Sequence, residues 1–265
     1  MKEFILDQAE MLALMTAVNT SLIMGIDNER LIPDAQEKQA ELAWQGIDSL
    51  KQRGLLRVED DTHIVNGDLM MMATAIAFPQ VMTFITRDVP GVGQQQFFHY
   101  RNDPVNVELT MPTEAQYRLA ALPDAVVALE RIRQILPVTF TEETISEQQT
   151  IEQELFLQVK TWAEQGAFSQ AEEALQANGF AAASAERLVQ TIHSPSLGGT
   201  IAFMQVDDQE VVDGRNLAMV QDDQVAWLMQ QAVPGEPVLN VMTVTAVAYS
   251  TALLEALNSL LQPEI

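Results

Sequence analysis

The sequence contains no cysteine. Disulfide scaffolds, thiolate zinc sites, iron–sulfur clusters and cysteine nucleophiles are therefore excluded. Basic residues are also scarce, because 14 Lys and Arg stand against 37 Asp and Glu and leave a net charge of −23. A surface this negative repels phosphate backbones and anionic lipids, and no stripe of Lys and Arg offsets it. We therefore expect neither nucleic acid nor a membrane as a partner.

Only one segment is long and uncharged enough to compare with a membrane span. It covers the 18 residues between Glu236 and Glu255 and contains Pro237 and several polar residues. The apolar spacing within it changes from the period of a strand to that of a helix, which favours a buried strand followed by a core helix. Near the N-terminus, Asp7 and Glu10 disfavour a signal peptide. We therefore expect a cytoplasmic protein.

An internal repeat organises the rest of the chain. Sliding the sequence on itself by 120 positions aligns Phe97–Val105 with Leu217–Val225, and no gap is needed over roughly thirty residues. Further along, Leu109 meets Met229 and Leu119 meets Leu239. The repeat predicts two copies of one arrangement of strands and helices.

Each copy is predicted to contain about three helices, a four-stranded antiparallel meander and a packing helix, so the fold class is α+β with a pseudo-two-fold relation. Helix starts are indicated by the capping pairs Asp7 with Glu10, Asp34 with Glu37, and Ser169 with Glu172. The strands are expected at residues 81–87, 96–101, 105–111 and 116–121, and again at 200–206, 215–221, 225–230 and 238–242. The packing helices are expected at residues 124–136, stopped by Pro137, and 245–261, stopped by Pro263.

The predicted boundary between the copies follows Pro137. Residues 1–137 form the first α+β repeat and residues 138–265 the second, joined by a polar stretch at 139–149. Acidic residues exceed basic ones in both, with 19 against 11 in the first repeat and 18 against 3 in the second. Short linkers and a large apolar inventory, 48% of all residues, favour packing of both repeats as one body.

No constellation of residues predicts catalysis. The three histidines, His63, His99 and His193, lack the spacing of a metal site or a catalytic group, and we expect structural roles for them. The doublets Asp60-Asp61, Asp207-Asp208 and Asp222-Asp223 lack the spacing of a calcium loop and are expected to be solvated turns. The sequence therefore predicts no enzyme, no cofactor and no metal.

A loop in the first meander is the best candidate for partner binding. In an antiparallel hairpin it is longer than a turn requires, and its counterpart after Asp207-Asp208 differs. Thirteen Met residues add adaptable apolar surface, although most are expected in the core. The candidate residues are Asp88, Val89, Pro90, Gly91, Val92, Gly93, Gln94 and Gln95.

A second feature points to a different function. Residues Leu50–Ile64 look like the end of a winged-helix unit and its wing. Because acidic neighbours offset Lys51, Arg53 and Arg57, a structural or protein-binding role is favoured over DNA binding. The alternative function is therefore a winged-helix-containing regulatory protein that binds a small ligand or a dimer partner.

The acidity, the repeated meander-helix units and the opening helix with Arg53-Gly54-Leu55-Leu56 together resemble the EspG-type chaperones of ESX (type VII) secretion. The resemblance covers nearly the whole chain and is architectural, without a short diagnostic motif. It implies a non-enzymatic cytoplasmic adaptor or secretion chaperone that masks an apolar helical segment of a partner protein. It also implies that the loop at residues 88–95 contributes to binding. The residues themselves fix neither the partner nor the oligomeric state.

Overall fold

The computed structural model describes residues 2–261 except 21, 34, 143–145 and 234. It divides into two compact units that are each built from three stretches of chain. The first unit comprises Met1–Phe84, Gln96–Ala128 and Met204–Val212, and the second comprises Ile85–Gln95, Leu129–Phe203 and Asp213–Ile265. These compact units do not test the two repeats expected from the sequence, so the boundary after Pro137 stays a prediction.

The first unit contains an antiparallel sheet in the order β1-β7-β6-β5-β4. Its strands are β1 (Glu3–Asp7), β4 (Val81–Val89), β5 (Gly93–Asn102), β6 (Val105–Thr113) and β7 (Gln116–Leu122). The hairpin end of β4 and β5, at Ile85–Gln95, belongs to the second unit. In β6, Val107 and Leu109 are fully buried, and they alternate with residues that face the other side of the sheet. Strand β1 pairs with β7, with Leu6 opposite Tyr117.

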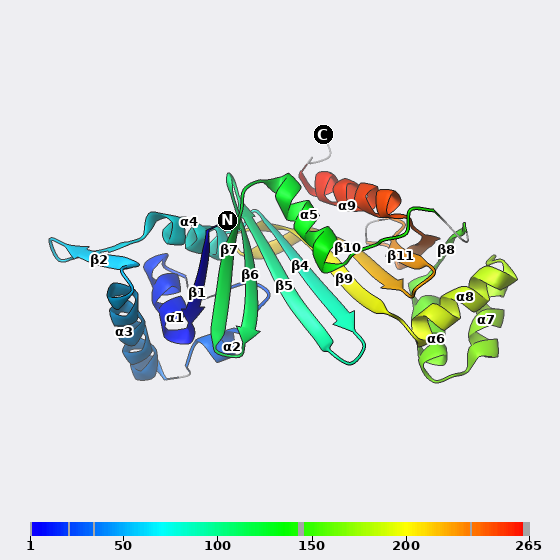
Figure 1. Cartoon of the computed structure of the whole chain (residues 1–265), viewed down its shortest axis with the longest axis horizontal. Helices are drawn as coiled ribbons and strands as arrows, with labels where there is room; N and C mark the ends of the chain where they lie inside the picture. The colour runs from blue at the N-terminus through cyan, green and yellow to red at the C-terminus, as the bar shows by residue number, and fades with distance from the viewer. Residues whose placement is uncertain (1, 21, 34, 143–145, 234, 262–265) are drawn as a thin grey trace. The chain divides into compact units, whose positions relative to one another are not determined.

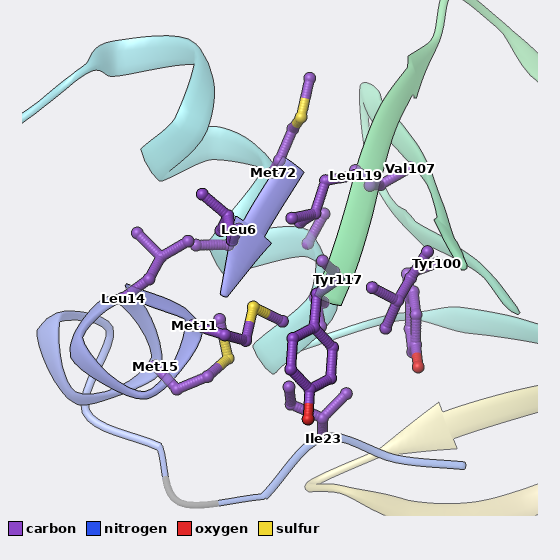
Figure 2. Close-up of a cluster of buried hydrophobic side chains, with 14 of the residues drawn as sticks. Leu6, Met11, Leu14, Met15, Ile23, Met72, Tyr100, Val107, Tyr117 and Leu119 are labelled. Carbon is purple, nitrogen blue, oxygen red and sulfur yellow. The ribbon is translucent and has the colours of Figure 1, made fainter. Parts of the chain in front are cut away.

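Helices cover one face of this sheet. They are α1 (Gln8–Ala17), the single turn α2 (Asn28–Leu31), α3 (Gln36–Gln52) and α4 (Gly67–Ala77), while α5 (Ala125–Ile135) follows β7. Figure 2 shows Met11, Leu14 and Met15 of α1 directed toward the side chains of the sheet. All three are essentially buried, so this apolar layer is the core of the unit.

Helices α1 and α3 approach each other closely at Gly46. A Cβ added to Gly46 would lie 1.9 Å from the backbone oxygen of Ala9, so only glycine fits at this crossing. The buried carboxylate of Glu10 joins the same two helices, because it accepts hydrogen bonds from Ser49 Oγ at 2.7 Å and Arg53 Nη1 at 2.5 Å. Glu10 also completes the capping box with Asp7 that the sequence predicts.

The second unit has a similar but simpler order of elements: an edge strand, three helices, a four-stranded meander and a final helix. Its strands are β8 (Gln148–Glu152), β9 (Leu197–Asp207), β10 (Glu210–Gln221), β11 (Ala226–Gln231) and β12 (Val238–Thr243), in the order β9-β10-β11-β12-β8. Helices α6 (Gln153–Glu164), α7 (Phe168–Ala177) and α8 (Ala182–His193) pack against one another, as Figure 1 shows. They share a core with Trp227 and Val241 of the sheet, and α9 (Ala246–Leu261) follows β12.

Strand register agrees between the units where β5 pairs with β6 and β10 pairs with β11. Phe98 lies opposite Leu109, and Ala218 lies opposite Met229, which is the same pairing displaced by the predicted offset. The ungapped alignment fails in the last strand, because Val241 and not Leu239 lies opposite Met229. The connection from β11 to β12 is longer than the turn from β6 to β7, and this added length shifts the register. The origin of the two units by duplication stays a prediction.

The predicted α+β class, the two meanders and their packing helices are confirmed. The sequence analysis missed β1 and β8, and β8 occupies part of the stretch read as a polar linker. The predicted cap of α7 is wrong, since its N-cap is Ala167 and makes no side-chain hydrogen bond. The predicted Asp34 cap and the Pro263 stop lie outside the described residues.

The predicted wing is a two-stranded hairpin of β2 (Leu56–Glu59) and β3 (Thr62–Val65) that follows α3 directly. Asp60 and Asp61 form its turn, and both have positive φ. Among the helices of the described residues, none combines the length and the apolar composition that a membrane span requires.

The close crossing of α1 and α3 predicts that replacing Gly46 by alanine destabilises the protein, although this replacement usually stabilises a helix. Gly→Ala inside a helix normally stabilises by about 1 kcal/mol. Gly46→Ala should instead lower the free energy of unfolding by about 1–3 kcal/mol, because the added methyl group separates the helices. Urea unfolding measures the change. The control Gln45→Ala, at an exposed position of the same helix, should shift stability by less than about 0.5 kcal/mol.

Candidate functional site

The candidate segment of residues 88–95 is a tight hairpin rather than a long loop. Strand β4 continues to Val89 and strand β5 begins at Gly93, so only Pro90, Gly91 and Val92 lie between the strands. The Val92 N–H donates to the Val89 carbonyl, and Val92 is 67% exposed. The expectation of an unusually long loop is therefore wrong. The tip still differs from the β9–β10 turn, which has two connecting residues, Asp208 and Gln209.

A groove in the second unit begins at this hairpin. Its volume is about 280 Å³, and its lining comes from β4, β5, β9, β10, β11, α6 and the end of α8. Of the candidate residues, Asp88 and Gln94 line it, whereas the residues between them do not. The other lining residues are Thr86, Phe156, Lys160, Glu164, Ile192, Pro195, Gly198, Gly199, Thr200, Ala218, Met219, Val220 and Met229.

Small side chains form the sheet side of the groove. Ala218 and Val220 are half-buried and pack against the core shared with α6, α7 and α8. Thr200 lies beside them and is exposed. Its backbone N–H donates to Thr86 Oγ1 at 3.0 Å, and the two Thr hydroxyls are 2.8 Å apart. The sheet therefore offers an apolar floor with one pair of hydroxyl groups.

The helix side of the groove carries the charge. Phe156 of α6 is nearly buried, while Lys160 Nζ lies 3.7 Å from Glu164 Oε1, one turn further along the helix. Across the groove, the exposed carboxylate of Asp88 has no hydrogen-bonding or ionic partner among the described residues. Because Lys160 is already paired, the groove presents net negative charge. It is suited to an apolar group with a positive charge beside it.

The three histidines each contact a neighbouring aromatic ring, carbonyl or carboxylate. His193 Nδ1 lies 3.0 Å from the Ala163 carbonyl, and its ring meets Phe168 edge to face. The buried His99 lies 3.2 Å from the carboxylate of Glu108, and the exposed His63 lies beside Trp44. Among the described residues, no group of three or more His, Asp or Glu side chains is arranged to hold a metal ion.

One acidic doublet differs from its expectation as a solvated turn. Asp222 is buried, and it accepts hydrogen bonds from Thr191 Oγ1 at 2.7 Å and from the backbone N–H groups of Gln224 and Val225. Arg187 adds an ion pair at 2.6 Å. Burial alone would raise the pKa of Asp222, but these donors outweigh it and hold the pKa below its usual value. Asp222 therefore fastens α8 to the β10–β11 turn.

Sequence reasoning missed most of the groove. The predicted strand begins at residue 200, whereas β9 already begins at Leu197 and contains Gly198 and Gly199. A signal was present, since the small residues at positions 198, 200, 218 and 220 lie where the first meander has large ones. No residue type in this set indicates chemistry by itself.

The fold resembles that of a known chaperone. The chain matches the Mycobacterium tuberculosis type VII secretion system chaperone EspG5, whose solved structure is in complex with a PE25–PPE41 dimer. The TM-score is 0.66, and the match covers 100% of this chain and 99% of the other at 15% sequence identity. At this identity the likeness establishes the fold alone. No protein-family model matches the sequence, and a search of curated proteins gives no significant match.

The lowered pKa of Asp222 generates a prediction of pH dependence. Asp222→Asn should cost about 1–2 kcal/mol of stability at pH 7, because charge-assisted hydrogen bonds become neutral ones. The folded-state pKa lies below the ordinary value of 3.8, so the stability from the carboxylate is present above that value and is lost as pH falls through the folded-state pKa. Thermal unfolding of both proteins at several pH values should show the difference shrinking below about pH 4.

The neighbouring Asp223 is exposed and provides the control. Asp223→Asn should leave stability within about 0.5 kcal/mol of the parent at every pH. A difference between Asp222→Asn and the parent that stayed constant down to low pH would contradict the assignment of the effect to the carboxylate.

Proposed function

We propose that the protein is a non-enzymatic, cytoplasmic chaperone or adaptor that binds a segment of a partner protein. The observation that carries this proposal is the groove of the second unit, which combines an apolar floor with an unpaired carboxylate. A fold shared with a secretion chaperone supports the same class of function. The groove lacks clustered groups of the kind that catalysis uses, and its volume lies just below the roughly 300–1,000 Å³ of small-molecule pockets.

In this proposal the hairpin tip is the outer part of the binding surface. Val92 is exposed at the tip, and Asp88 and Gln94 extend from the same hairpin into the groove. An exposed apolar residue at the rim of a groove adds contact area when a partner covers it. The high negative charge of the chain further favours a partner whose contacting segment is basic, and it speeds the encounter of the two.

The winged hairpin gives weaker support to the alternative of a regulatory protein. Its turn carries Asp60 and Asp61, and Arg57 is paired with Glu59 at 3.1 Å. A duplex-binding wing needs free Lys or Arg to neutralise phosphates. The local charge therefore favours a structural or protein-contacting role for β2 and β3.

The proposal predicts that one substitution at the hairpin tip will remove a specific partner. Val92→Asp places a charge where the partner is expected to bury apolar surface, and it should reduce capture of that partner at least about tenfold. Capture is measured by affinity purification from the native cytoplasm with quantitative mass spectrometry. The purified partner should then form a complex with the parent protein in size-exclusion chromatography.

Val247→Asp is the matched control. Val247 is 75% exposed near the start of α9 and does not line the groove, so this variant should capture the partner as the parent does. Identical partner sets for the parent and both variants, or no specific partner with any of them, would contradict the proposed function.

A further inference from the structure

Strands β4 and β5 of the first unit correspond to strands β9 and β10 of the second. The face that these strands form is covered by the chain in the first unit and is open in the second. Matching hydrogen bonds fix the correspondence: Gln80 N–H donates to the Arg101 carbonyl, and Ser196 N–H donates to the Gln221 carbonyl. Pro79 and Pro195 precede these donors, each following the last turn of a helix. Four residues of β4 and β5 therefore correspond to four residues of β9 and β10. The pairs are Met82 with Gly198, Phe84 with Thr200, Phe98 with Ala218, and Tyr100 with Val220.

In the first unit, the chain covers this face with its own irregular segment, residues 22–27. Ile23 is fully buried and Ile26 nearly so, both in the core that contains Phe98 and Tyr100. The Tyr100 hydroxyl donates to the Met24 carbonyl at 2.6 Å. Gly25 passes so close that an added Cβ would lie 2.2 Å from Met82 Cε. The large side chains of the sheet thus pack against a covering segment that has a glycine, Gly25, where it comes closest to the sheet.

In the second unit, the covering segment is missing, and the side chains on the sheet are small where those of the first unit are large. Only residues 165–167 join α6 to α7, whereas residues 18–35 lie between α1 and α3. Gly198, Thr200, Ala218 and Val220 then form the floor of the groove. An added Cβ at Gly198 would have no neighbour closer than the Met219 backbone oxygen at 3.7 Å, so the space above this residue is free.

We infer that the groove receives an irregular, non-helical segment of the partner protein, which inserts one bulky apolar side chain above Gly198 and carries a Lys or Arg that pairs with Asp88. This inference rests on the proposed function and specifies the partner's segment, which is non-helical and so differs from the apolar helical segment that the family resemblance implies. Because the floor is formed by small residues, the occupant supplies the volume that Met82 and Phe98 supply in the first unit. The hydroxyl of Thr200 shares one hydrogen bond with the Thr86 hydroxyl and keeps a lone pair that can accept from a backbone N–H of the occupant.

Charge supports a basic residue in the occupant. Lys160 is the only cation among the described residues that line the groove, and it already pairs with Glu164. Asp88 has no ionic partner among the described residues. A partner cation beside the apolar anchor is therefore favoured, and a second copy of this acidic chain is disfavoured.

The test selects short peptides from a displayed random library on the parent protein and measures their affinity by fluorescence anisotropy. Selected peptides should share one bulky apolar residue with a nearby Lys or Arg. Gly198→Phe fills the groove and should weaken binding at least about tenfold, whereas Gly198→Ala should change it less than about twofold. Asp88→Lys should weaken binding severalfold and reduce its dependence on salt. Peptides with Pro beside the anchor should still bind, because no helix is required.

Thermal unfolding checks that each variant is folded, and Asp88→Lys tests the same groove without altering the sheet. Equal affinity of the selected peptides for the parent and for Gly198→Phe would overturn the inference, as would loss of binding for every Pro-containing peptide. If Val92→Asp releases the captured partner protein while Gly198→Phe retains it, the proposed function stands and the assignment to the groove fails. If neither variant releases the partner, both proposals fail.

Discussion

Coverage of one sheet face by helices is the constraint on which the rest of the structure depends. An antiparallel meander has an apolar side that must be buried, and each unit buries it under helices. In the first unit this requirement places Gly46 at the crossing of two helices and Glu10 between them. In the second unit it places Asp222 at the junction of α8 and the β10–β11 turn. These contacts hold the helices on the sheet, and the groove lies where that coverage ends.

The two units therefore differ in whether the chain itself covers the whole apolar face of the sheet. The first unit closes its sheet face with residues 22–27, whereas the second leaves the same face to be closed from outside. The helices of a unit can pack on the sheet in the same way and still leave a binding surface exposed, provided that the connection between two of the helices is short. The link between α6 and α7 is only three residues long and leaves this face open, and the small residues of β9 and β10 set the size of what can enter.

The sequence predicted those parts of the fold whose signals are local. The strand at residues 105–111 and the capping box at Asp7 each depend on neighbours within a few residues, and the structure has both, as β6 and at the start of α1. Strands β1 and β8 escaped prediction because they are short edge strands of five residues that pair on one side only. Helix α7 begins at Ala167 without a side-chain cap, so tertiary packing and not the predicted Ser169 pair sets its start.

The candidate site was predicted only in part, for a related reason. Pro90 and the two glycines drew attention to the hairpin, and Asp88 and Gln94 do line the groove. The sequence did not predict the floor of the groove. Gly198 and Ala218 indicate an open space only when they are compared with Met82 and Phe98 at the corresponding positions of the first unit. The ungapped alignment pairs Phe98 with Ala218, but it pairs Gly198 with Phe78 instead of Met82, because β4 and β9 correspond at an offset of 116 rather than 120.

Hydrogen exchange of the complex with its captured partner tests the central claim most directly. The account predicts that partner binding slows exchange at residues 86–95, 198–200 and 218–220, while the β2–β3 hairpin exchanges as in the free protein. Slowed exchange confined to β2, β3 and α3, with the groove unchanged, would contradict it.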